Sequence, residues 1–210
     1  MFSRLNYSIL KNIRENRLFY LGFIIVFSLG ISFGAYWVNN LTLESKDLLI
    51  KYLNGFFALI PANTLSSFSI LKASLANNML SIILLLVFGL TYLGIAFSPL
   101  YAIFKGFCFG FSIAFLVRGF GKKGLIFSIA SLLPHCIISI PGTIFLCTIS
   151  LQYSLYILKS RSEIRYEKKS QNLINYLFLF MLGSMMIILS IVIESYITPV
   201  FIRGISSFLI

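Results

Sequence analysis

Few residues of this 210-residue sequence could carry out acid–base, nucleophilic or metal chemistry. The one histidine, His135, follows Pro134 inside a long apolar segment, where it could act as a metal ligand or a proton relay. A lone histidine at a helix break more often satisfies backbone groups that the proline leaves without partners. We therefore expect His135 to have a structural role.

The remaining candidates for chemistry do not form a recognisable set. Cys108, Cys136 and Cys147 lie in apolar runs, form no CxxC pair and have no histidine at the spacing of a metal site. We expect them to be small buried hydrophobic residues. None of the six acidic residues lies clearly inside an apolar span, and neither an HExxH nor a Walker A motif is present. The sequence predicts no catalytic, cofactor-binding or metal-binding residues, and hence no enzyme.

Lys105 is the one charged residue in the apolar run "PLYAIFKGFCFGFSIAFLV", residues 99–117. If a helix begins at Pro99 with Ser98 as its N-cap, Lys105 lies roughly 9 Å along the helix axis. A lysine stem can extend toward the headgroups from there, so we expect Lys105 to snorkel to the nearer surface. The alternative is an intramembrane ion-pathway residue, but no acidic partner is evident in a neighbouring span.

The composition indicates a protein whose solvent is mostly lipid. Hydrophobic residues make up 59% of the chain, charged residues 11%, and the mean hydropathy is +0.95. A soluble domain carries about 25% charged residues. The net charge of +11 suits cytoplasmic loops and anionic headgroups. We do not expect nucleic-acid binding, because no basic patch is combined with a soluble fold.

Apolar runs predict an all-α, polytopic membrane protein with a single integral membrane domain, residues 1–210. We expect about five spans, at residues 18–38, 79–97, 99–117, 125–158 and 176–193. The first span is too long for the apolar segment of a signal peptide, so we expect it to be uncleaved. The fourth run would measure about 51 Å as one helix, which exceeds a bilayer. We expect it to break at Pro134 and Pro141.

Two connections between the spans carry most of the polar residues. The outer loop, residues 39–78, contains two apolar patterns at helical spacing, one on each side of Pro61. They predict amphipathic helices that lie on the membrane or dock a partner, with Phe56 and Phe57 as the docking face. Residues 159–175 are rich in basic residues and predict a cytoplasmic loop, with the N-terminus also cytoplasmic.

Small residues recur at helical spacing in two of the expected spans. Gly30 and Gly34 form a GxxxG pattern in the first span, and Gly106, Gly110 and Ala114 form a similar stripe in the third. Such stripes allow helix backbones to approach closely. We expect them to pack against other helices, and oligomerisation is left open.

Three segments together resemble the stage II sporulation protein M family: "IRENRLFYLGFIIVFSLGISFGAYWVNNL", "FKGFCFGFSIAFLV" and "GLIFSIASLLPHCIISIPGTI". The resemblance covers essentially the whole chain and includes the Pro134–His135 pair. It implies a multi-pass protein of the mother-cell or septal membrane of a sporulating bacterium. Such a protein would organise two peptidoglycan hydrolases, an amidase and a lytic transglycosylase, during forespore engulfment.

The alternative function is a membrane subunit of a transporter or permease. Broken helices near the bilayer midplane occur in transporters. A transporter subunit would need a pumping partner and polar residues around a cavity, and the sequence shows few of the latter.

Overall fold

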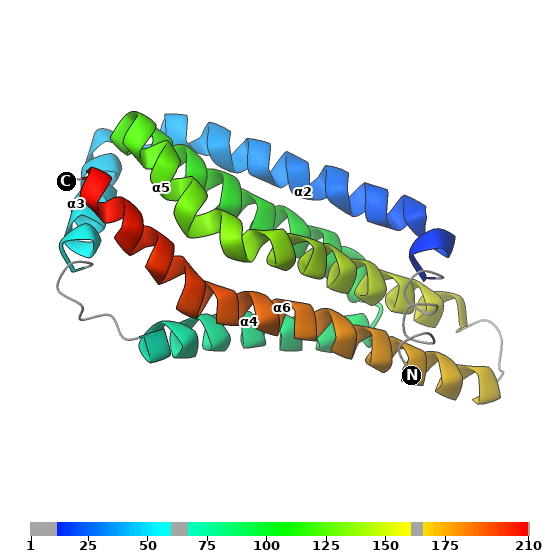
Figure 1. Ribbon diagram of the computed structural model, residues 1–210. Coiled ribbons are helices and arrows are strands. Elements are labelled where there is room, and N and C mark those ends of the chain that lie inside the picture. Colours follow the sequence, from blue (N-terminus) through cyan, green and yellow to red (C-terminus); the bar gives the residue numbers. More distant parts are fainter. Residues whose placement is uncertain (1–11, 60–66, 161–165, 210) are drawn as a thin grey trace.

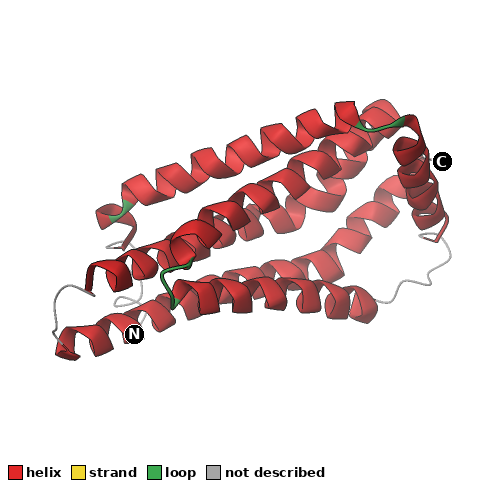
Figure 2. Ribbon diagram, turned by 180° about the vertical axis from the view of Figure 1, so that it is seen from behind, coloured by secondary structure: helices red, strands yellow, loops and turns green. Residues whose placement is uncertain are grey.

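The computed structural model describes residues 12–59, 67–160 and 166–209, and these residues are almost entirely helical. The prediction of an all-α protein is confirmed for this part of the chain. Figure 1 shows the long helices packed side by side, and Figure 2 shows the same bundle from behind, with α3 beside the end of α6 in both views. The elements are α2 (Arg17–Trp37), the 3-10 turn η1 (Val38–Asn40), α3 (Leu43–Leu59), α4 (Ser67–Gly89), α5 (Gly94–Ser160) and α6 (Tyr166–Leu209).

Four helical stretches are long and apolar enough to cross a membrane: Arg17–Asn40, Phe68–Gly89, Gly94–Lys159 and Gln171–Val200. Large apolar side chains on them point outward, for example Leu29, Leu80, Leu100 and Val200. Such an outer surface is unfavourable in water and suits lipid. The chain is therefore a membrane protein, as its composition predicted.

The longest helix, α5, folds back on itself at Gly121. Its 67 residues would extend about 100 Å as a straight helix, three times the thickness of a bilayer core. Gly121 has φ 59° and ψ −135°, a conformation that glycine adopts at little cost. Phe109 and Ile113 of the first leg line the same groove as Ile129 and Leu133 of the second leg, so the two legs lie side by side. The total of five crossings stays a prediction.

The expected break of the fourth span at Pro134 and Pro141 is wrong. The second leg of α5 stays helical through both prolines, and the only non-helical residue described within α5 is Gly121. A proline removes one backbone hydrogen bond, and within a bundle neighbouring helices can satisfy the freed carbonyl. The break occurs instead between the third and fourth expected spans.

Several helix boundaries also differ from the expected spans. α5 begins at Gly94, so the buried Ser98 lies within the helix and is not an N-cap. The second amphipathic pattern of the outer loop is largely the start of α4, which runs without interruption into the second span. Residues 166–175 of the expected cytoplasmic loop are helical, and α6 continues well beyond residue 193.

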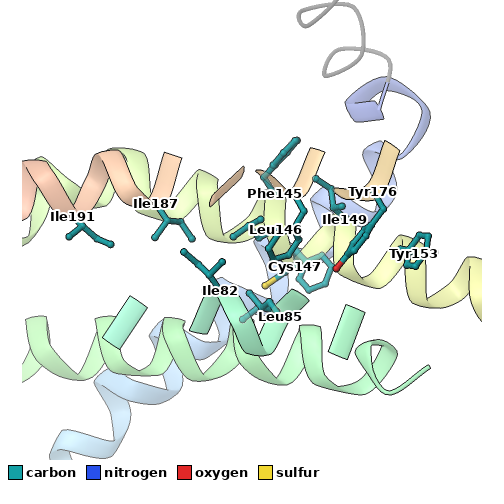
Figure 3. Packing of buried hydrophobic residues seen from close by; sticks show 13 residues of the cluster. Ile82, Leu85, Phe145, Leu146, Cys147, Ile149, Tyr153, Tyr176, Ile187 and Ile191 are labelled. Atoms are coloured by element: carbon teal, nitrogen blue, oxygen red, sulfur yellow. The ribbon is translucent and has the colours of Figure 1, made fainter. Parts of the chain in front are cut away.

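The main core of the bundle lies where α4, the second leg of α5 and α6 meet (Figure 3). Hydroxyl groups from α5 and α6 donate to carbonyls in the last turns of α4: Ser150 Oγ to Leu85 O at 3.1 Å, Ser154 Oγ to Gly89 O at 3.1 Å, and Tyr176 OH to Leu86 O at 3.2 Å. Leu86 O also accepts from the Leu90 amide at 3.1 Å, whereas Gly89 O belongs to the last turn of α4, where a carbonyl has no amide partner within the helix and lipid offers none. These bonds fix the end of α4 and the turn that follows it.

α2 crosses the first leg of α5 through the glycines of both small-residue stripes. A Cβ added to Gly30 would lie 3.2 Å from Gly106 Cα, and one added to Gly106 would lie 3.3 Å from Gly30 Cα. Side chains at Gly34 or Gly110 would collide with backbone atoms of the opposite helix. The two helices therefore meet backbone against backbone, an approach that only residues without a side chain permit.

Gly106→Leu should destabilise the protein by about 1–3 kcal/mol or more, because α2 and α5 must separate to accommodate the new side chain. Thermal unfolding of the purified protein in detergent would measure the loss. Gly22→Leu is the matched control, since a Cβ at Gly22 meets no atom within 4 Å. A wild-type melting temperature for Gly106→Leu would contradict the close contact.

Candidate functional site

A polar cavity of about 340 Å³ lies among α2, α4, both legs of α5 and α6. All of its lining residues belong to the four candidate membrane-spanning stretches. Polar and charged groups at such depth are costly and commonly mark functional sites in membrane proteins. The polar lining residues are Ser74, Asn77, Asn78, Lys105, Cys108, Ser112, His135, Cys136, Ser139, Thr143, Ser190 and Glu194.

Lys105 faces this cavity from the first leg of α5. Its Nζ donates to Asn78 Oδ1 at 3.4 Å and lies 5.9 Å from the centre of the Tyr101 ring. Because α5 begins at Gly94, Lys105 lies roughly 17 Å along the helix axis from its start, nearly twice the expected distance. The premise of the snorkelling hypothesis, a helix that begins at Pro99, is therefore wrong.

Glu194 supplies the acidic group that the sequence analysis did not find in a neighbouring span. α6 runs through Glu194, whose Oε2 accepts a hydrogen bond from Ser74 Oγ. Asn78 Nδ2 in turn donates to the backbone carbonyl of Ser74 at 2.9 Å. Lys105 and Glu194 are thus connected through a single turn of α4. The continuation of the apolar pattern beyond Glu194, to Val200, was the signal that could have placed this carboxylate inside a span.

His135 lines the cavity from the second leg of α5. Its Nε2 lies 3.3 Å from Cys136 Sγ. The ring also interacts with the backbone of Ser131. Its buried Nδ1 nevertheless makes no hydrogen bond of normal geometry with any residue of the described ranges. His135 therefore adds an imidazole to the cavity wall, with its Nδ1 buried away from the contents of the cavity.

The other residues singled out in the sequence lie at different places. Gly30, Gly34, Gly106 and Gly110 form the crossing of α2 and α5, directly beside Lys105. Pro134 precedes His135 on the second leg of α5, and Pro141 lines an apolar groove of about 310 Å³ between the two legs. Phe56 and Phe57 belong to α3, but their side chains lie outside the part of the chain that the structure describes.

The arrangement suits the binding of polar groups. Among residues 12–59, 67–160 and 166–209, no cluster of three or more His, Cys, Asp or Glu residues could hold a metal ion. The cavity instead combines one cation, one anion and several hydroxyl and amide groups. Each of these can bind a group of complementary charge or hydrogen-bonding character.

The family model described as Stage II sporulation protein M matches residues 23–199, a region that includes every residue of the polar cavity. Neither curated proteins nor solved structures show a match to this chain.

Removal of one charge from the cavity should cost more stability than removal of both. Lys105→Met removes the one cation, and Glu194→Gln the one anion, among the residues that line the cavity. Each change should cost up to about 3 kcal/mol, because it leaves one half-buried charge without the opposite charge of the cavity. Thermal unfolding of the single and double variants would measure this.

The double variant should lose less stability than the sum of the two single losses. Lys105→Arg retains the positive charge and serves as the control, with a stability close to that of the wild type. Losses that simply add would contradict an interaction between Lys105 and Glu194.

Proposed function

Because the chain belongs to the stage II sporulation protein M family, we propose that it is a membrane scaffold for peptidoglycan hydrolases during sporulation. It would localise and organise an amidase and a lytic transglycosylase for septal wall remodelling and forespore engulfment. Family membership is the observation that carries this proposal, and it makes the chain a sporulation-related membrane protein. The protein itself would cleave no peptidoglycan and would reside in the mother-cell or septal membrane.

The architecture is compatible with a scaffold that binds partners outside the membrane. α3 joins α2 to α4 at one end of the bundle and is not among the stretches apolar enough to span a membrane (Figure 1). It carries charged residues such as Glu44 and Lys51 together with an exposed apolar side chain, Leu48. We propose that α3 faces the extracytoplasmic side and docks the amidase, with Phe56 and Phe57 in the contact.

The orientation that we propose places the N-terminus in the cytoplasm. The start of α2, the end of α5 and the start of α6 lie at the same end of the bundle, opposite α3 (Figure 1). Arg14, Arg17 and Lys159 lie at this end, and the positive-inside rule favours its cytoplasmic placement. Lys122 and Lys123 lie beside the Gly121 turn at the opposite end, so they reduce the excess of basic residues at the proposed cytoplasmic end.

The polar cavity favours a second candidate function, a membrane subunit of a transporter or permease. Substrate sites of transporters lie near the bilayer midplane, where polar groups of several helices converge. A pull-down from sporulating cells separates the two functions. Wall hydrolases among the captured proteins would support the scaffold, whereas an ATPase would support transport.

Deletion of the protein should stop engulfment after the septum has formed. A fluorescent fusion of the wall amidase should then lose its septal enrichment, because the proposed scaffold no longer retains it. Fluorescence microscopy of sporulating cells would measure the enrichment, and re-expression of the wild-type chain should restore it. Normal septal enrichment in the deletion strain would exclude the scaffold role.

Thiol labelling should reveal opposite sides of the membrane for α3 and for the start of α6. In a cysteine-free background, Lys51→Cys should react with a membrane-impermeant reagent in intact protoplasts. Gln171→Cys should react only after permeabilisation, since both positions are exposed but lie at opposite ends of the bundle. The reverse pattern would contradict the proposed orientation.

A further inference from the structure

We propose that the polar cavity is a binding site for a small zwitterionic solute, with Lys105 holding its anionic group and Glu194 its cationic group. The proposal concerns the interior of the bundle and does not depend on partners bound at α3. It rests on the contacts of the two charges, the size of the cavity and the balance of charge on its walls.

Both charged side chains retain hydrogen-bonding capacity beyond their bonds to α4. An ammonium group has three N–H donors, and a carboxylate has about four acceptor positions. The bond to Asn78 uses one donor of Lys105, and the bond from Ser74 uses one acceptor position of Glu194. At this depth lipid offers no partners, and unsatisfied polar groups are costly. A solute that carries both an acceptor and a donor meets these two requirements together.

The helix α4 holds the two charges at separate points of the cavity wall. Ser74 and Asn78 lie four residues apart on one face of α4, so their Cβ atoms are about 5–6 Å apart. Lys105 is bonded at one of these positions and Glu194 at the other. Both charges line the same cavity, so a molecule in it can contact both.

The other walls are consistent with a small solute. A volume of about 340 Å³ lies at the lower end of the range for small-molecule sites, about 300–1,000 Å³. His135, Ser139, Thr143 and Ser190 add groups for further hydrogen bonds. The remaining walls are apolar: Phe27, Phe109, Leu132 and Ile140. A site for a simple anion or cation would present one sign of charge, whereas this cavity presents one of each.

Two natural cysteines provide a test for which no new cysteine has to be introduced. Cys108 lines the cavity and is exposed, whereas Cys147 is fully buried in the core of the bundle. Two proteins that each retain one of these cysteines, with serine at the other two positions, would be reconstituted in nanodiscs. A small water-soluble methanethiosulfonate should modify Cys108 and leave Cys147 unmodified, because the reaction needs a hydrated thiolate.

Solutes of matched size then identify what the cavity recognises. Glycine and β-alanine carry both charges, while acetate and methylammonium each carry one. At about ten times its Kd, a bound zwitterion should slow modification of Cys108 roughly tenfold by mass action. Acetate and methylammonium at the same concentration should change the rate little. Lys105→Met and Glu194→Gln should each abolish the protection, and an unmodified Cys147 in the same variants would show that the bundle remains folded.

Three outcomes would overturn the proposal. No modification of Cys108 would mean that the cavity is closed to water, and modification that none of the four solutes slows would mean that it holds water alone. Protection by acetate or methylammonium equal to that by glycine would mean a site for a single charge. The comparison of solutes on the wild-type cavity holds even if a variant fails to fold. None of these results bears on the position of the amidase, so the scaffold role stands or falls separately.

Discussion

The bundle depends on the hydrogen bonds that other helices make to α4. Lipid provides no partners for polar groups, so each polar group within a span must find a partner in the protein or in an enclosed cavity. Hydroxyls of Ser150, Ser154 and Tyr176 bind the C-terminal turns of α4, and Lys105 and Glu194 bind its middle. α4 thereby connects α5 to α6 at two levels. The bonds at the C-terminal turns of α4 hold the core together, and those at its middle form part of the cavity wall.

The close approach of α2 and α5 determines where the remaining wall of the cavity lies. Gly106 lies against the carbonyl of Phe27, and Phe27 and Lys105 both line the cavity. A wider crossing would separate Phe27 from Lys105 in the cavity wall. The glycine stripes and the charged residues are therefore parts of one arrangement, in which the backbone contact sets the position of the charge.

The sequence predicted the features that local composition determines. The all-α class, the membrane setting and the first span, residues 18–38 against the observed Arg17–Trp37, follow from apolar runs whose length matches a bilayer. The reversal of α5 at Gly121 lies between the two apolar runs, residues 99–117 and 125–158, that were expected to form separate spans. The expectations at Pro134, Pro141 and Ser98 are wrong, because the effect of these residues on a helix depends on the helices packed around them. The cavity was missed because Glu194, Lys105 and His135 come together only through tertiary packing.

The reversal of α5 at one glycine has a consequence for how the chain enters the membrane during synthesis. Only Gly121 separates the two legs of α5. This link is too short for one leg to insert into the membrane before the other, so the two legs must enter as a helical hairpin. Lys122 and Lys123 sit at its tip and must cross the bilayer in the proposed orientation, which is unfavourable for the charges alone. The combined apolar surface of two legs compensates this cost. The second leg, with His135, thus enters the membrane together with the leg that carries Lys105.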